Sequence, residues 1–152
     1  SYRFDRIKST DAIFLKIIPA KNRTDYIYSS NPASDTVFAF SFFVYKETDS
    51  IINIFNKDCP LVKTKNYKIK GKNYCVRKYY YDEENSFDEE SSIFYNENYG
   101  LLVYYNDGWS TLINTLYYDE ISLQLVDSIL NDKSGFYKQI PPPPPKIKNE
   151  LK

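Results

Sequence analysis

The apolar residues of this chain come in short runs, each about the length of a β-strand and each followed by residues that favour a turn. Clear examples are residues 37–45, 101–105 and 109–117. Asn106-Asp107-Gly108 separates the last two, and Asp-Gly between alternating apolar runs is the strongest local signal for a hairpin. Sixteen Tyr and ten Phe point the same way, because aromatic side chains pack well on a pleated surface. We therefore predict a meander of about six to eight antiparallel strands, curled toward a half-barrel.

The remaining strands are predicted at residues 12–18, 51–55, 67–70, 73–81 and 92–95. Residues 21–35 are polar and small, which indicates a loop with at most one short strand at residues 26–28. The run 37–45 is apolar at both sets of alternating positions, so we expect it at the centre of the sheet with both faces covered. Gly71-Lys72 between two runs suits a type II′ turn.

Near the C-terminus the spacing changes to that of a helix. Ile121, Leu125 and Ile129 lie four residues apart, Asp119 can cap the start, and Gly135 can end the element. We expect an amphipathic helix over residues 120–132. The predicted fold class is therefore α+β: a mostly antiparallel, aromatic-rich sheet with one C-terminal amphipathic helix.

Composition divides the chain into one domain and a tail. Residues 1–138 have the length and apolar content of a single β-rich globular domain. Residues 139–152 contain five consecutive prolines, which adopt an extended polyproline II conformation. This tail is either a stiff spacer or a ligand for an aromatic groove on a partner, with Pro141, Pro142 and Pro143 as binding candidates.

The charge balance argues against a nucleic-acid partner. Twenty Lys and Arg offset twenty Asp and Glu, so the whole chain does not attract a polyanion. The lysine-rich residues 63–72 could belong to a single-strand nucleic-acid groove, but they better fit an edge strand that lysines protect from aggregation. The apolar runs are also too short to cross a bilayer, so we predict no transmembrane segment.

The absence of His removes the commonest general base and metal ligand, and we predict no cofactor. Carboxylates remain, and they are densest at residues 82–90. Asp82, Glu84 and Asp88 are weak candidates for a Ca²⁺ site, because the spacing lacks the alternating ligands and central glycine of a calcium loop. A pair of acids for glycoside hydrolysis is set by distances across a fold, so local sequence neither supports nor excludes it.

The sequence allows two interpretations of Cys59 and Cys75. An even cysteine count in an exported domain permits a disulfide, and two free thiols fit the sequence as well. A chain that starts at Ser1 without a leader or any Met fits cleavage from a longer precursor. We therefore expect export, to the periplasm, the cell envelope or the medium, with room for a lipid anchor upstream. A cytoplasmic location is the alternative.

The aromatic residues are the most distinctive feature for function. Alternate residues of a strand point to opposite faces, so some tyrosines must face outward, where they would form a rigid binding surface. The candidates are Tyr79, Tyr81, Tyr95, Tyr99, Tyr104 and Trp109. The competing interpretation is that each completes the core. The sequence thus favours a non-enzymatic accessory or binding subunit that presents an aromatic face to a protein partner. The alternatives are a cytosolic inhibitor or immunity-type protein acting through residues 82–90, and a carboxylate-dependent glycoside hydrolase.

Overall fold

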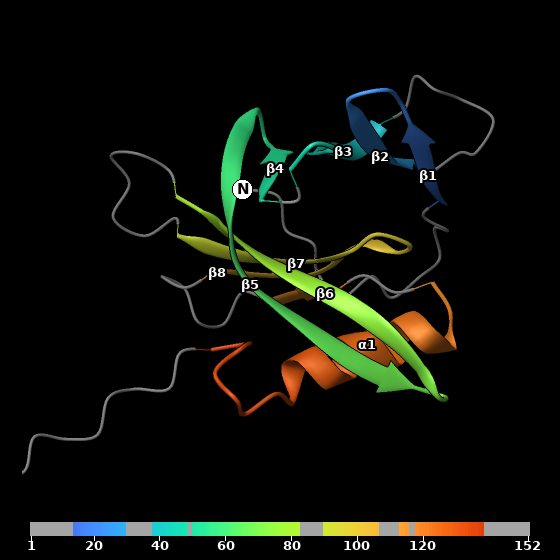
Figure 1. The fold of residues 1–152 in the computed structure, drawn as a ribbon, viewed down its shortest axis with the longest axis vertical. Coiled ribbons are helices and arrows are strands. Elements are labelled where there is room, and N and C mark those ends of the chain that lie inside the picture. The colour runs from blue at the N-terminus through green and yellow to red at the C-terminus, as the bar shows by residue number, and fades with distance from the viewer. Residues whose placement is uncertain are drawn as a thin grey trace, which may run out of the picture.

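The structure is a computed structural model of the 152-residue chain, and it describes residues 14–29, 38–48, 50–82, 90–106, 113–115 and 118–138. Within these ranges, nine antiparallel strands follow one another in sequence order as a single meander, and one helix comes after them (Figure 1). The elements are β1 (Phe14–Pro19), β2 (Arg23–Ser29), β3 (Phe38–Tyr45), β4 (Ile51–Ile54), β5 (Lys57–Ile69), β6 (Lys72–Tyr81), β7 (Ser91–Asn96), β8 (Gly100–Asn106), β9 (Ile113–Thr115) and α1 (Glu120–Leu130). The predicted aromatic-rich antiparallel sheet with one C-terminal helix is confirmed.

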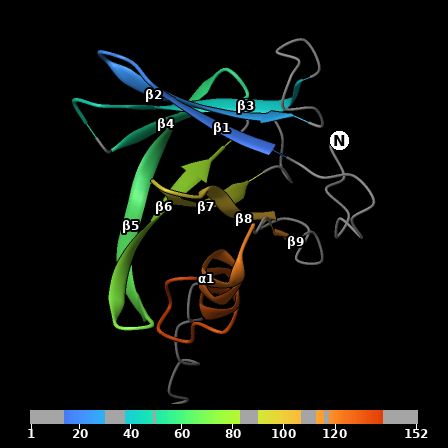
Figure 2. The same cartoon turned by 90° about the vertical axis from the view of Figure 1, so that its right-hand side faces the viewer.

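Strand β5 divides the meander into two layers. Its first residues, from Lys57 to Pro60, pair with β4, and the residues from Leu61 to Ile69 pair with β6. The pairing register shifts between Leu61 and Lys63, where one sheet gives way to the other. We call β1–β4 with the first part of β5 sheet A, and the second part of β5 with β6–β9 sheet B. Figure 2 shows sheet A, sheet B and α1 stacked as three layers, with β5 running from the first layer toward the last.

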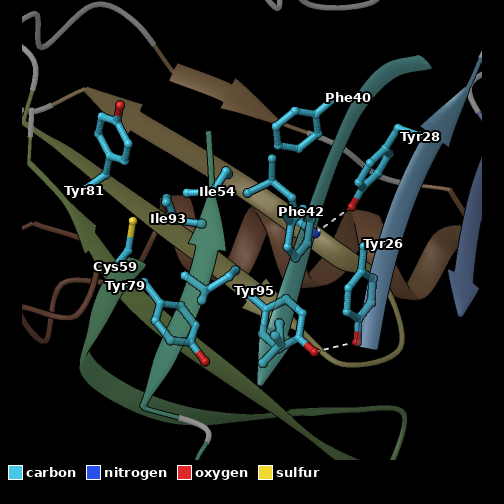
Figure 3. Close-up of a cluster of buried hydrophobic side chains, with 13 residues drawn as sticks. Tyr26, Tyr28, Phe40, Phe42, Ile54, Cys59, Tyr79, Tyr81, Ile93 and Tyr95 are labelled. Atoms are coloured by element: carbon cyan, nitrogen blue, oxygen red, sulfur yellow. Dashed lines mark hydrogen bonds between the residues drawn. The ribbon is translucent and has the colours of Figure 1, made fainter. Parts of the chain in front are cut away.

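Each gap between layers is filled by a hydrophobic core. The core between the two sheets is shown in Figure 3 and consists of Tyr26, Tyr28, Phe40, Phe42, Val44, Ile52, Ile54, Cys59, Tyr79, Tyr81, Ile93, Tyr95 and Leu101. The core between sheet B and α1 consists of Ile69, Val76, Phe94, Leu102, Val103, Tyr105, Leu125, Val126, Ile129, Phe136 and Tyr137. Sheet B is the middle layer, so every residue of β7 is buried.

Two strand predictions need correction. Residues 23–29 form the full strand β2 rather than a loop with one short strand at residues 26–28, because the alternation of Thr24, Tyr26 and Tyr28 places all three on the inner face. Strand β5 begins at Lys57 and passes through Pro60 to Ile69, so it is much longer than the strand that we predicted at residues 67–70. The amide of Leu61 donates to the carbonyl of Ser50 at 2.7 Å, so position 60 points its backbone groups away from β4. Proline is tolerated there because no ladder hydrogen bond is lost.

Strand β3 is covered on one face only, contrary to the prediction. Phe40, Phe42 and Val44 are buried between the sheets, whereas Ser41 on the other face is exposed. The reason is that sheet A is an outer layer. In the order of strands, β5 rather than β3 occupies the middle.

The hairpin between β5 and β6 also differs from the prediction, in the type of its turn. Ile69 pairs with Lys72, so the two loop residues are Lys70 and Gly71, and their φ angles are 49° and 78°. Positive φ at both positions is the pattern of a type I′ turn rather than the predicted type II′.

The second part of β5 is an edge of sheet B with Lys63 and Lys68 exposed, as predicted for the lysine-rich segment.

Helix α1 starts as predicted and ends earlier. Asp119 caps it, with its carboxylate accepting from the Ser122 amide at 2.8 Å. The helix stops at Leu130 instead of Asp132 because Asp132 turns toward sheet B. Its carboxylate there accepts hydrogen bonds from Lys65 and from the Tyr67 hydroxyl, the latter at 2.7 Å. This clamp ties the end of α1 to β5.

Candidate functional site: the outer face of sheet A

The predicted aromatic surface is largely interior. Tyr79, Tyr95 and Tyr81 expose 0%, 2% and 9% of their surface, so the prediction that they face a partner is wrong. Alternation along β6 and β7 turns these three rings toward sheet A, which covers them. Tyr99 and Tyr104 are partly buried: Tyr99 donates to the Asp119 carboxylate at 3.0 Å, and Tyr104 lies against the inter-sheet core. These five tyrosines therefore do not form a platform.

Several other candidates lie outside the described residues, namely Trp109, Pro141, Pro142, Pro143, Glu84 and Asp88. Asp82 is described and is exposed at the end of β6. Among the described residues, no group of three or more His, Cys, Asp or Glu side chains is placed to hold a metal ion.

The two cysteines are free thiols, so the disulfide reading is not supported. Leu61 pairs with Tyr79, which places Cys59 beside the Tyr81 end of β6, whereas Cys75 lies near the opposite end. Six residues of β6 separate these positions, or about 20 Å at the rise of a strand. A disulfide needs Cα atoms within roughly 7 Å. Burial raises the pKa of the Cys59 thiol to about 11, which makes it unreactive at neutral pH.

The surface that the structure does offer is the outer face of sheet A. Strand alternation and register assign fourteen positions to it. Its residues are Phe14, Lys16, Ile18, Arg23, Asp25, Ile27, Ser29, Ser41, Phe43, Tyr45, Ile51, Asn53, Asp58 and Pro60. In the part of the chain that the structure describes, no helix or strand packs over this face (Figure 2). The open face of an antiparallel sheet is normally polar, so the many apolar residues here set this face apart.

The pairing register places a mixed row of side chains across the middle of this face. Ile18 pairs with Asp25, Asp25 with Phe43, Phe43 with Asn53, and Asn53 with Asp58. The row runs from the outermost strand β1 to β5, so five strands contribute to one continuous patch.

One charged side chain, that of Arg23, packs on the Phe43 ring. The guanidinium carbon of Arg23 lies 4.2 Å from the centre of the Phe43 ring, and the Arg23 Nε lies 3.4 Å from the Asp25 carboxylate. Cation–π contacts at exposed sites contribute about 0.5–1 kcal/mol, and exposed ion pairs contribute less. These contacts do little for the stability of the domain, but they fix the Arg23 side chain across the ring.

Tyr45 is oriented in a similar way by polar neighbours. Its ring meets the Phe43 ring edge to face, with centroids 5.2 Å apart and an angle of 85° between planes. The Tyr45 hydroxyl donates to the Asp58 carboxylate at 3.2 Å, and the Asn53 amide donates to the same oxygen at 2.8 Å. Desolvation and the bond to Asp58 raise the pKa of Tyr45, so its hydroxyl stays a neutral donor.

The patch is thus an ordered amphipathic surface. Aromatic side chains that are already fixed lose little conformational entropy when a partner binds. Arg23, Asp25 and Asp58 lie on it with opposite charges, so it has no strong net field. We did not predict this site because we expected residues 37–45 to be covered on both sides. Ser41 inside that run and the Arg23–Asp25 pair beside Tyr26 are the signals that could have revealed an open face.

No protein-family model, curated protein or solved structure matches this chain. Among the described residues, no helix has the length and apolar character needed to span a bilayer.

Proposed function

We propose that this domain is a non-enzymatic binding module, an accessory subunit of a larger assembly, which presents the outer face of sheet A to a protein partner. The observation that carries the proposal is the patch centred on Phe43 and Tyr45. It sets two aromatic rings among polar residues on the open face of the sheet, where a solvated face is normally polar, and contacts with Arg23 and Asp58 hold the two rings in place.

A protein partner suits this surface better than the other classes of ligand. Protein interfaces are enriched in Tyr, Phe and Arg at the centre, with charged residues toward the rim. A sugar would stack on exposed ring faces, but Arg23 covers one face of Phe43. A nucleic acid would require a strongly basic surface, whereas Arg23 and Lys16 share this face with Asp25 and Asp58.

The size of the patch sets what a partner must contact. Five strands about 4.8 Å apart and about five residues long cover on the order of 400 Å². A standard interface buries about 800 Å² on each partner. The patch therefore supplies the central part of an interface, and a partner would also contact its margins.

The free cysteines bear on where the protein works. Because both cysteines are free thiols, there is no disulfide to argue for export. Free thiols agree equally well with a cytoplasmic location. The alternative of a cytosolic inhibitor that binds through residues 82–90 stays open for this reason. Export to the periplasm or envelope remains a prediction.

Chemical cross-linking in native cells, followed by purification through an affinity tag, tests the proposal. The face variant is Tyr45→Lys, which places a charge at the centre of the patch. The matched control is Leu123→Lys on the exposed side of α1, where the native leucine is 37% exposed. Circular dichroism verifies that both variants fold.

We expect the control to recover the same cross-linked partner as the native chain, and the face variant to lose it. Recovery of that partner by Tyr45→Lys at the native level would contradict the proposal. Loss of the cross-linked partner from Leu123→Lys alone would show that the binding surface is on α1.

A further inference from the structure

The second part of β5 has a free edge, whose neighbours along the chain, residues 50–82, are all described. The last contact of β5 with sheet A is the Leu61 amide, which donates to the Ser50 carbonyl at 2.7 Å. Beyond it, residues 63–69 pair with β6 on one side, and no described strand pairs with their other side. Figure 2 shows this part of β5 at the left margin of the fold, beside α1.

The pairing register decides which backbone groups point toward this edge. Ile69 pairs with Lys72 across a two-residue turn, and residues that flank such a turn bond to each other. Bonded pairs recur at every second residue of an antiparallel ladder, so the odd-numbered residues of this segment bond to β6. The even-numbered residues Thr64, Asn66 and Lys68 therefore direct their N–H and C=O groups to the free edge.

These outward groups suit a peptide backbone better than a nucleic acid. Three N–H donors alternate with three C=O acceptors, and an extended peptide can pair with both kinds of group. A phosphodiester backbone has no N–H to offer, so it would leave the carbonyls without a partner. The lysines of this segment therefore point to an acidic protein segment and not to a polyanion.

Two lysines supply the charge that selects such a segment. Lys63 and Lys68 are exposed, and among the described residues no carboxylate lies within ion-pair distance of either. Lys65 lies between them and already pairs with Asp132. Alternation places Lys63 on the α1 side of the strand and Lys68 on the other side. One cation is thus available on each face of the edge.

The end of α1 limits the size of side chains that an added strand can carry. Lys65 donates to the Ser134 hydroxyl at 2.9 Å, and the Tyr67 hydroxyl donates to the Asp132 carboxylate at 2.7 Å. Asp132 and Ser134 therefore occupy the α1 side of the edge at these two positions. Partner residues across from Lys65 and Tyr67 must be small.

We propose that the free edge of β5 binds an extended acidic segment of a partner protein as an added antiparallel strand. One acidic residue of the segment lies across from Lys68, and a second, five positions further along, lies across from Lys63. Opposite charges on neighbouring strands are favourable. The edge belongs to sheet B, so this contact does not rest on the proposed role of the outer face of sheet A.

A second copy of this chain fits the edge poorly. Its β5 would bring a second set of the same lysines onto the neighbouring strand, where like charges repel. Exposed lysines on an edge strand oppose pairing between copies for this reason. An acidic strand turns the same repulsion into attraction, so the lysines exclude one occupant and select the other.

Amide hydrogen exchange measured by NMR on the unbound protein tests whether the edge is open. We expect fast exchange at Thr64, Asn66 and Lys68, and slow exchange at Lys65 and Tyr67, which bond to β6. Slow exchange at all five amides would overturn the proposal, because another part of the chain or a second copy would already cover the edge.

Binding is measured by NMR titration with a synthetic peptide, capped at both ends. The peptide has glutamates across from Lys68 and Lys63, alanines across from Tyr67 and Lys65, and threonines at the two positions between. We expect the amides that face the edge to shift and to gain protection from exchange. A matched peptide with lysines in place of both glutamates should bind about tenfold more weakly. Equal affinity of the two peptides, or no binding of either, would contradict the proposal.

N-methylated peptides separate strand addition from simple charge attraction. A methyl group on the residue across from Asn66 removes a donor aimed at β5, and should weaken binding about tenfold. A methyl group on the residue across from Lys65 should change little, because that N–H points away from β5. Equal effects of the two methyl groups would show that the peptide does not bind as a strand.

Charge reversal on the protein completes the test. The double variant Lys63→Glu with Lys68→Glu should reverse the preference between the two peptides. Lys21→Glu, at an exposed position in the turn between β1 and β2, is the control and should retain the native preference. An unchanged preference in the double variant would overturn the proposal. Tyr45→Lys should bind the glutamate peptide as the native chain does, so a failure at the β5 edge is distinguishable from a failure of the outer-face contact.

Discussion

The hydroxyl oxygens of Tyr26 on β2 and Tyr95 on β7 lie 2.5 Å apart, inside the core between the two sheets (Figure 3). Tyr26 also donates to the Glu97 carbonyl at 2.9 Å. A carbonyl can only accept, so the single Tyr26 proton goes to Glu97 and Tyr95 donates to Tyr26. This short chain of hydrogen bonds joins sheet A to the turn between β7 and β8. It keeps the outer face of sheet A in a fixed position on the domain.

The direction of these bonds predicts unequal effects of two conservative substitutions. Tyr26→Phe leaves both the Tyr95 hydroxyl and the Glu97 carbonyl without a partner, and should lower the free energy of unfolding by about 2 kcal/mol. Tyr95→Phe removes one donor and should cost about 1 kcal/mol. Urea denaturation measures both. Tyr45→Phe, which removes an exposed hydrogen bond, serves as the control and should change little. A larger loss for Tyr95→Phe than for Tyr26→Phe would contradict this assignment of donors.

Position 100 must be a glycine because the Tyr28 hydroxyl occupies the space that a Cβ would need. The φ of Gly100 is 68°, and a Cβ there would overlap the Tyr28 hydroxyl oxygen and lie 3.2 Å from the Tyr26 ring. Gly100→Ala should destabilise the domain by about 2–3 kcal/mol. Gly71→Ala is the matched control, since its φ is 78° but no atom lies within 4 Å of the added Cβ; it should cost about 1 kcal/mol.

A second substitution separates the clash at Gly100 from backbone strain. Tyr28→Phe removes the oxygen that the new Cβ would meet, so Gly100→Ala should cost less in that background than in the native chain. Thermal unfolding of the four proteins gives this coupling energy. Strictly additive effects would show that the hydroxyl is not the source of the cost.

The clamp at Asp132 predicts how stability depends on acid. The side chain of Asp132 is 2% exposed. Hydrogen bonds from Lys65, Ser134 and Tyr67 outweigh the cost of desolvation and hold the pKa of Asp132 well below its ordinary value. A folded pKa below the unfolded one means that the stabilisation is complete above the unfolded value of about 3.9 and is lost as pH falls through the folded pKa.

Asp132→Asn removes the charge and should destabilise the native chain by about 2 kcal/mol at neutral pH. The difference from the native protein should shrink as pH is lowered below about 4. Unfolding curves across this range provide the measurement. A difference that stays constant down to strong acid would show that the carboxylate charge does not hold α1 to β5.

The two thiols should differ in reactivity. Cys75 is half-buried, whereas Cys59 is 1% exposed with its pKa raised to about 11. We expect a thiol reagent such as iodoacetamide to label Cys75 in the folded protein and Cys59 only after unfolding, as mass spectrometry of the peptides would show. Absence of labelling at both sites after unfolding without reductant would mean that the two form a disulfide after all.

Local patterns were sufficient to predict most elements of the fold. The four-residue spacing of Ile121, Leu125 and Ile129 indicated the helix, and short aromatic runs between turns indicated a meander. The bend of the meander was not predictable in this way. Strand β5 belongs to both layers, and nothing local to Lys57 or Pro60 shows that a continuous strand passes from one sheet into another.

The failure to predict the site follows from that bend. Tyr79 and Tyr95 lie on strands with many aromatic residues, and in a single sheet some of these must face water. Once sheet A folds over sheet B, the same rings become the inner layer. The aromatic pair on the open face is then Phe43 and Tyr45, both half-buried, on the strand that we expected to be most deeply covered. Which face of a strand is open depends on how layers stack, and alternation alone does not determine this.

Hydroxyl-radical footprinting of the native assembly tests most directly whether the outer face of sheet A is the contact surface. The rates of side-chain oxidation are compared between the purified chain and the chain recovered in complex with its partner. We expect protection of Phe43 and Tyr45 in the complex, with Leu123 on α1 oxidised at the same rate in both samples. Protection of Leu123 with unchanged oxidation of Phe43 and Tyr45 would contradict this expectation.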